Sequence, residues 1–294
     1  MAALDTVTGA WLMERARAAG DLVGACHGSG TPVIPVRVDG KTVRGAKNAD
    51  GSQVHLLAAL AGERGVVAAQ IEVGAKTNEI PVIIPLLGGL DLDRAVITAG
   101  ALRCQRATAD YVHRRGADFA LPVKDNQPGL SGAPGAPPWH DAPVTHAAAD
   151  RGHGRVTTRT IQVTDAPGDL PFPHVSQVYL IERHVTALDG SPPSEVAAPG
   201  VTSLPATRAD PGTIAGLVRG QWATESLHWL RSPGTLYQED KSQVRTRSGP
   251  RAMAALRNLA TGALHQAGRH DTTEATRWAS RYIDRPFTIL GLAS

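Results

Sequence analysis

The sequence predicts an α/β protein, and three observations support that class. Short apolar, β-branched segments at 36–43, 54–60 and 65–73 have the length and spacing of three successive strands. Helical and strand-like segments then alternate up to residue 123, an order typical of α/β folds. The 294 residues are 42% apolar and 19% charged, so the chain has the composition of a folded protein with a sizeable core.

The first half of the chain supplies most of the expected elements. Residues 4–19 have helical apolar spacing and stop at Gly20, and a glycine-rich connector at 24–30 leads into the first strand. The remaining elements expected in this half are a hairpin loop at Glu63-Arg64-Gly65, a helix at 78–87, a strand at 95–98, a helix at 105–115 and a strand at 118–123.

The second half alternates polar loops with longer elements. Segments 129–143 and 187–199 are rich in proline and predict loops, while 155–163 and 176–185 alternate as strands do. Asp210-Pro211 begins a helix that runs to about residue 231, with Asp210 as its cap. Residues 250–267 predict a further helix whose apolar stripe consists of Ala252, Leu256, Leu259, Ala260, Ala263, Leu264 and Ala267.

Charge and cysteine content limit the functional class. Thirty basic and 27 acidic residues leave a net charge of +3, which permits a nucleic-acid partner without demanding one. The two cysteines, Cys26 and Cys104, have no metal-binding spacing, and Cys104 is interpreted as a small buried residue. No apolar run is long enough for a membrane span, and no signal peptide is evident. We expect a cytoplasmic protein.

The segment 36–45 carries the first candidate functional residue. Asp39 is expected at the end of a strand, where Gly40 turns the backbone and Lys41 and Arg44 follow. A carboxylate among cations suits a divalent metal and a phosphodiester. An ordinary Asp-Gly hairpin turn with solvated basic neighbours explains these residues equally well.

Eight blocks, in one order along residues 36–292, resemble bacterial insertion-sequence transposases of the H-repeat-associated kind. The first is Val-Asp-Gly-Lys-Thr-Val-Arg-Gly at 38–45; the others lie at 53–60, 75–81, 123–128, 151–155, 201–204, 239–246 and 256–260. The resemblance implies a ribonuclease-H-like mixed sheet flanked by helices. It also implies a domain at 36–292, with a β-rich insertion at about 129–205 before the last catalytic helix, preceded by an N-terminal helix and connector at 1–35.

The resemblance further implies an Asp-Asp-Glu triad that holds two magnesium ions. Asp39 corresponds to the first acid and Glu225 to the third, and Trp222 and Trp229 flank Glu225 on its helix face. Without the resemblance, both tryptophans would be interpreted as core residues and Glu225 as a surface residue. The two acids are the expected metal ligands.

The second acid of the triad is absent. The family pattern places an aspartate where this chain has Gly100, in Val-Ile-Thr-Ala-Gly-Ala-Leu at 96–102. Removing one carboxylate takes about one negative charge from a site that must balance up to about four positive ones. We therefore expect weak metal binding and little or no DNA strand transfer.

The family positions also identify further candidates. The former site would contain, besides the acids and Gly100, Lys41, Lys124, Asn126 and His228. The expected DNA contacts are Lys41, Arg44, Lys76, Lys124, Arg151, Arg155 and Arg245. His228 could instead have only a structural role, and residues 151–155 could be a flexible loop that makes no contact with phosphate.

Three functions fit these observations. The first is a transposase-family protein, a degenerate or domesticated relative, that binds DNA but is impaired in catalysis. The second is a recruited, metal-independent enzyme that acts on a small molecule, with Asp39 and Glu225 as an acid–base pair. The third is a non-catalytic binding module. A homodimer is compatible with each.

Overall fold

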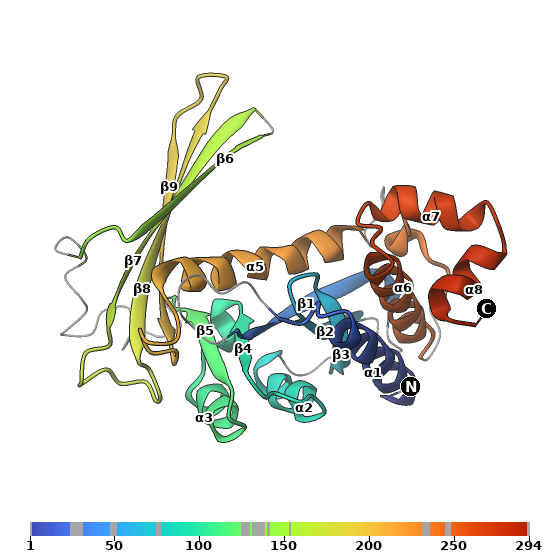
Figure 1. Cartoon of the computed structure of the whole chain (residues 1–294), viewed down its shortest axis with the longest axis horizontal. Helices are drawn as coiled ribbons and strands as arrows, with labels where there is room; N and C mark the ends of the chain where they lie inside the picture. The colour runs from blue at the N-terminus through green and yellow to red at the C-terminus, as the bar shows by residue number, and fades with distance from the viewer. Residues whose placement is uncertain are drawn as a thin grey trace. The chain divides into compact units, whose positions relative to one another are not determined.

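The computed structural model confirms the α/β class. It describes residues 2–23, 32–47, 52–74, 78–124, 130, 139, 142–152, 154–230, 236–244 and 248–292. The chain divides into two compact units. Unit 1 comprises residues 1–24, 34–91 and 222–294, and unit 2 comprises residues 25–33 and 92–221. Both units combine strands with helices (Figure 1).

Unit 1 is built on three antiparallel strands in the order β3-β2-β1. Their bounds are Ile34–Lys47 for β1, Gln53–Ala61 for β2 and Val66–Val73 for β3. The helical segments of this unit are α1 (Ala2–Ala18), η1 (Ile80–Val82), α2 (Ile83–Gly88), η3 (Glu239–Lys241), α6 (Gly249–Gln266), α7 (Thr272–Ser280) and α8 (Asp284–Leu290). The three predicted strands, the helix at 4–19 and the hairpin between β2 and β3 are confirmed.

One face of this sheet is covered by α1 and α6. Asp39 on β1 lies opposite Ala58 on β2, which lies opposite Gln70 on β3, so the three side chains share a face. On the same face Val43 and Leu56 pack against Ala254 of α6.

The helix predicted at 250–267 is confirmed as α6, but its predicted apolar stripe is only partly right: Ala263 and Leu264 are buried, whereas Ala260 and Ala267 are exposed. Leu256 is 46% exposed, whereas Ala254, Arg257 and Asn258 are buried. The buried face is partly polar because Arg257 and Asn258 have partners inside unit 1, Glu239 and Gln70. A prediction that places only apolar residues inside therefore missed Arg257 and Asn258 and wrongly placed Leu256 in the core.

Unit 2 combines a parallel strand pair with a long antiparallel ribbon. β4 (Ala95–Ala99) pairs in parallel with β5 (Asp118–Pro122), and the order continues β5-β9-β8-β7-β6 with antiparallel pairing. The ribbon strands are β6 (His146–Gly152), β7 (Arg155–Asp165), β8 (Gln177–Ala187) and β9 (Ser194–Thr202) (Figure 1). Helix α3 (Arg106–Arg114) follows the short η2 (Ala101–Arg103), and α5 (Pro211–Leu230) begins in this unit.

Helix α5 begins as predicted, because the Asp210 carboxylate accepts a hydrogen bond from the Thr213 amide at 2.8 Å. The loop predicted at 187–199 is wrong from Ser194 onward, where β9 begins. Pro199 is tolerated in that strand because its backbone faces the end of β5, where its carbonyl accepts from the Val123 amide. The loop predicted at 129–143 falls mostly outside the described residues.

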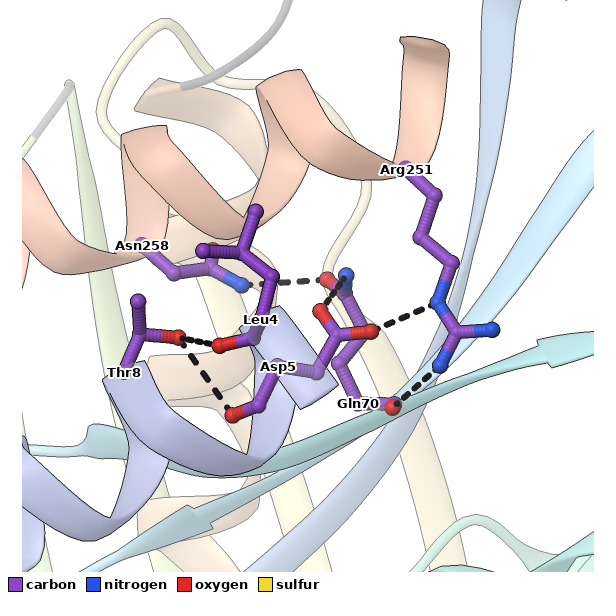
Figure 2. Close-up of polar contacts among 6 residues, drawn as sticks. All are labelled: Leu4, Asp5, Thr8, Gln70, Arg251 and Asn258. Carbon is purple, nitrogen blue, oxygen red and sulfur yellow. Dashed lines mark hydrogen bonds and ion pairs between the residues drawn. The ribbon is translucent and has the colours of Figure 1, made fainter. Parts of the chain in front are cut away.

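A buried polar cluster joins α1, β3 and α6 (Figure 2). The Asp5 carboxylate accepts hydrogen bonds from Arg251 Nε at 2.6 Å and from Gln70 Nε2 at 3.2 Å. Asn258 Nδ2 donates to Gln70 Oε1 at 3.0 Å. Burial raises the pKa of the Asp5 carboxyl, and Arg251 and Gln70 oppose that shift. The charge of Asp5 is therefore tolerated because Arg251 compensates it.

Replacing Arg251 with Met should destabilise the fold more as pH rises. A carboxyl group whose folded-state pKa is raised contributes stability below its unfolded pKa and loses it as pH rises through the folded pKa. Without Arg251 the pKa of Asp5 rises further, so the loss should be small near pH 4.5 and about 3 kcal/mol near pH 8. Urea unfolding at both values measures it. Arg17→Met, which breaks only an exposed pair with Asp91, is the control; equal losses at the two pH values for Arg251→Met would contradict the assignment.

Candidate active site

Asp39 lies within a continuous strand, and the prediction that it stands at a strand end followed by a turn is wrong. Residues 36–43 pair without interruption with β2, and Gly40 lies opposite Leu57. The alternative of an Asp-Gly hairpin turn is therefore excluded as well. Asp39 is half-buried.

Gly40 is required by a close neighbour and not by a turn. A side chain at this position would collide with the Glu79 carboxylate and would come within 2.8 Å of His55 Nε2. Glycine is the residue that permits such an approach to the backbone. The sequence identified Gly40 as a special position, but the reason for it is the side chain of Glu79, which lies far along the chain.

His55, Glu79 and Thr42 form a hydrogen-bonded network beside the strand that carries Asp39. His55 Nε2 lies 2.5 Å from Glu79 Oε1, and His55 Nδ1 lies 3.0 Å from Thr42 Oγ1. Thr42 lies opposite His55 on the paired strands β1 and β2, so this network lies on the sheet face opposite to that of Asp39. His55 lies in the block at 53–60 and Glu79 in the block at 75–81, but residue spacing alone does not identify either as a site residue.

Lys41 shares the face of Asp39 and is held by a buried carboxylate. Its ammonium forms an ion pair with Glu239, whose other oxygen accepts from Arg257 Nη1 at 3.1 Å. The Glu239 side chain is 1% exposed and that of Lys41 is 9% exposed. The positive charge of Lys41 is thus directed to a carboxylate of its own unit, and the pair anchors β1 to η3 and α6.

Gly100 follows the end of β4 in unit 2 and offers no side-chain ligand. Its backbone is extended, with φ −64° and ψ 158°, so any amino acid could adopt its conformation. A Cβ at this position would lie 3.2 Å from Nη1 of Arg103, a residue buried in the same unit. The side chain nearest to the position that a carboxylate at residue 100 would occupy is therefore the positively charged Arg103.

The neighbouring cysteine takes no part in this chemistry. Cys104 is fully buried, as the sequence analysis expected, and burial raises its pKa to about 12. A thiol with such a pKa stays protonated and unreactive near neutral pH.

The remaining candidates divide into three groups. Lys124, Arg151 and Arg155 are exposed on unit 2, the last two flanking the turn between β6 and β7. Arg44 lies on β1, and Trp222, Glu225, His228 and Trp229 lie on α5, but their side chains are not among those the structure describes. Lys76, Asn126 and Arg245 lie outside the described residues. The roles of all of them stay predictions.

No metal centre is formed by the described side chains. Across those residues, no group of three or more His, Cys, Asp and Glu side chains could hold a metal ion. Likewise, none of the helices in the described ranges has the length and apolarity to cross a bilayer.

Comparison with known proteins places the described site in context. Residues 34–262 match a protein-family model for the transposase DDE domain. Over 257 residues the chain is 26% identical to "Putative protein YbfL" of Escherichia coli K12, covering 81% of this chain and 66% of that protein. It is 28% identical over 245 residues to "Putative transposase YncI" of Escherichia coli O157:H7, covering 78% of this chain and 61% of that protein.

A third relative is "H repeat-associated putative transposase YhhI" of Escherichia coli K12, at 26% identity over 81% of this chain and 66% of that protein. The chain thus spans just under two thirds of the length of these relatives. A solved piggyBac transposase synaptic complex with hairpin DNA overlaps 87% of this chain and 53% of its own, at 9% identity and a TM-score of 0.45.

Replacing Glu239 with Gln should strongly destabilise unit 1. The change removes the buried carboxylate that pairs with both Lys41 and Arg257, and breaking such a buried charge cluster costs about 3–5 kcal/mol. Chemical denaturation measures the loss. Glu274→Gln is the matched control, because Glu274 is 60% exposed in its pair with Arg269 and its replacement should cost no more than about 0.5 kcal/mol. A Glu239→Gln protein as stable as this control would refute the buried charge cluster.

Proposed function

Because the chain belongs to the DDE transposase family, whose domain spans residues 34–262, we propose that it binds duplex DNA and is impaired in DNA strand transfer. The observation that carries the impairment is at Gly100, where a ligand is absent and the Arg103 guanidinium lies beside the empty position.

Electrostatics supports the loss of paired metal binding. Two divalent ions bring about four positive charges and need several carboxylate oxygens to balance them. Under the proposal only Asp39 and Glu225 remain, and the side chain beside position 100 is the Arg103 guanidinium, which cannot act as a ligand to a cation. This set of donors does not fit two magnesium ions, so we assign no reaction step to metal.

Contacts to DNA are proposed for the exposed cations. Lys124, Arg151 and Arg155 are exposed on unit 2 and can neutralise backbone phosphates without sequence specificity. Lys41 is engaged with Glu239, so the proposal does not depend on it. Arg44, Lys76 and Arg245 remain proposed contacts from the family pattern.

Binding to duplex DNA should weaken steeply with salt. Fluorescence anisotropy with a labelled duplex, repeated from low to physiological salt, should give a linear dependence of log affinity on log salt concentration. Lys124→Ala and Arg155→Ala should each reduce the slope by about 1, because each removes one phosphate contact. Arg17→Ala, an exposed arginine already paired with Asp91, should leave the slope unchanged. The absence of salt-dependent binding to any duplex would refute the proposed DNA partner.

Restoring the acid should restore metal binding only when Arg103 is also removed. We expect Gly100→Asp alone to gain little, because Arg103 would neutralise the new carboxylate, and Gly100→Asp with Arg103→Leu to bind Mn²⁺. Electron paramagnetic resonance measures the bound ion, and nicking of a supercoiled plasmid measures activity. Gly100→Asn with Arg103→Leu controls for size without charge. The assignment fails if the unmodified protein binds Mn²⁺ as tightly as the double variant does.

A further inference from the structure

Helices α7 and α8 lie beyond the part of the chain that the family model matches, which ends at residue 262 (Figure 1). Within this C-terminal segment, residues 281–292, which comprise the connection between these helices, α8 and the two residues after it, carry a concentration of exposed apolar side chains. Tyr282 is 60% exposed, Ile283 77%, Phe287 46% and Leu292 71%. Exposed apolar side chains gathered in one segment indicate a surface that meets a partner.

The same segment contains a stack in which guanidinium groups alternate with aromatic rings. The guanidinium carbon of Arg269 lies 3.5 Å from the ring centroid of Trp278, and that of Arg285 lies 4.4 Å from the same centroid. Arg285 also lies 4.3 Å from the ring centroid of Tyr282. The series Arg269, Trp278, Arg285 and Tyr282 therefore ends at a tyrosine ring that is largely open to solvent.

The segment also retains positive charge. Among residues 248–292, Arg269 approaches Glu274 at 3.5 Å, but no ion pair of the described chain includes Arg277, Arg281 or Arg285. Arg285 is fixed through its Nη1, which donates to the Trp278 carbonyl at 2.7 Å. A guanidinium stacked on rings keeps other N–H groups at its edge available for phosphate oxygens.

We propose that the Tyr282 end of this stack binds unpaired nucleotides of single-stranded DNA. A base would stack on the exposed ring of Tyr282, next to Ile283 and Phe287, while Arg281 and Arg285 contact the adjoining phosphates. The proposal rests on the proposed DNA partner and extends it from duplex to single strands.

The charge of the segment favours single-stranded DNA over a second copy of the protein as the binding partner. A twofold contact brings the same patch of both copies together, so the positive excess of the patch, in which Arg281 and Arg285 outnumber Asp284, would face itself. Nucleic acid supplies a ring face for Tyr282 and phosphates for Arg281 and Arg285, which form no ion pair among the described residues although Glu274 and Asp284 lie in the same segment.

Fluorescence anisotropy of the whole chain tests the proposal, with a labelled single strand and the same sequence as a blunt duplex. Tyr282→Ala should weaken single-strand binding about 5- to 100-fold, the range for losing one stacked base. Tyr282→Phe keeps the ring and should bind within about twofold of the unmodified protein. Duplex affinity should change by less than about twofold in both variants, because the duplex offers no unpaired base. Arg281→Ala, also exposed, should lower single-strand affinity and flatten its salt dependence by about one unit of slope.

The outcomes separate this proposal from the proposed function. Unchanged single-strand binding in Tyr282→Ala, with duplex binding intact, overturns the stacking surface and leaves the proposed function standing. No binding to either DNA overturns both. A dimer that Phe287→Asp dissociates, seen by light scattering alongside unchanged DNA binding in Tyr282→Ala, would assign the surface to a second copy. Binding of phosphatidylserine vesicles that Tyr282→Ala abolishes, without any change toward DNA, would assign it to a membrane.

Discussion

The buried carboxylate of Glu239 is the constraint on which the arrangement around Asp39 depends. A carboxylate without access to water is tolerated only where cations and hydrogen-bond donors compensate it, and here Lys41 and Arg257 do so. Lys41 is two residues from Asp39 on the same strand face. The position of Asp39 is thus linked to the packing of α6 and η3, which come from the far end of the sequence.

The sequence predicted the elements whose causes are local. The cap of α5 at Asp210, the hairpin after β2 and the ribbon strands β7 and β8 each follow from neighbouring residues, because capping and alternation act over a few positions. The buried face of α6 could not be predicted in the same way. Arg257 and Asn258 are interior only because Glu239 and Gln70 meet them, and those partners come from distant segments.

The candidate site shows the same division. The order of short blocks along the chain was enough to identify Asp39 and Gly100 as candidate positions. It did not show that Gly40 makes room for Glu79, that His55 joins Glu79 to Thr42, or that Arg103 stands beside position 100. Each of these is a contact between side chains whose direction depends on the completed fold, and none has a signature in residue spacing.

The division of the chain between the units has a consequence for synthesis on the ribosome. Apart from residues 25–33, unit 2 is one uninterrupted stretch, whereas unit 1 needs residues 222–294 to be complete. The ion pair of Lys41 therefore stays incomplete until η3 has emerged, and the polar cluster of Asp5 until α6 has emerged. A nascent chain folds as its segments become available. Unit 2 is therefore expected to fold first, and the unit that contains the strand with Asp39 is expected to fold only after residues 222–294 have been synthesised.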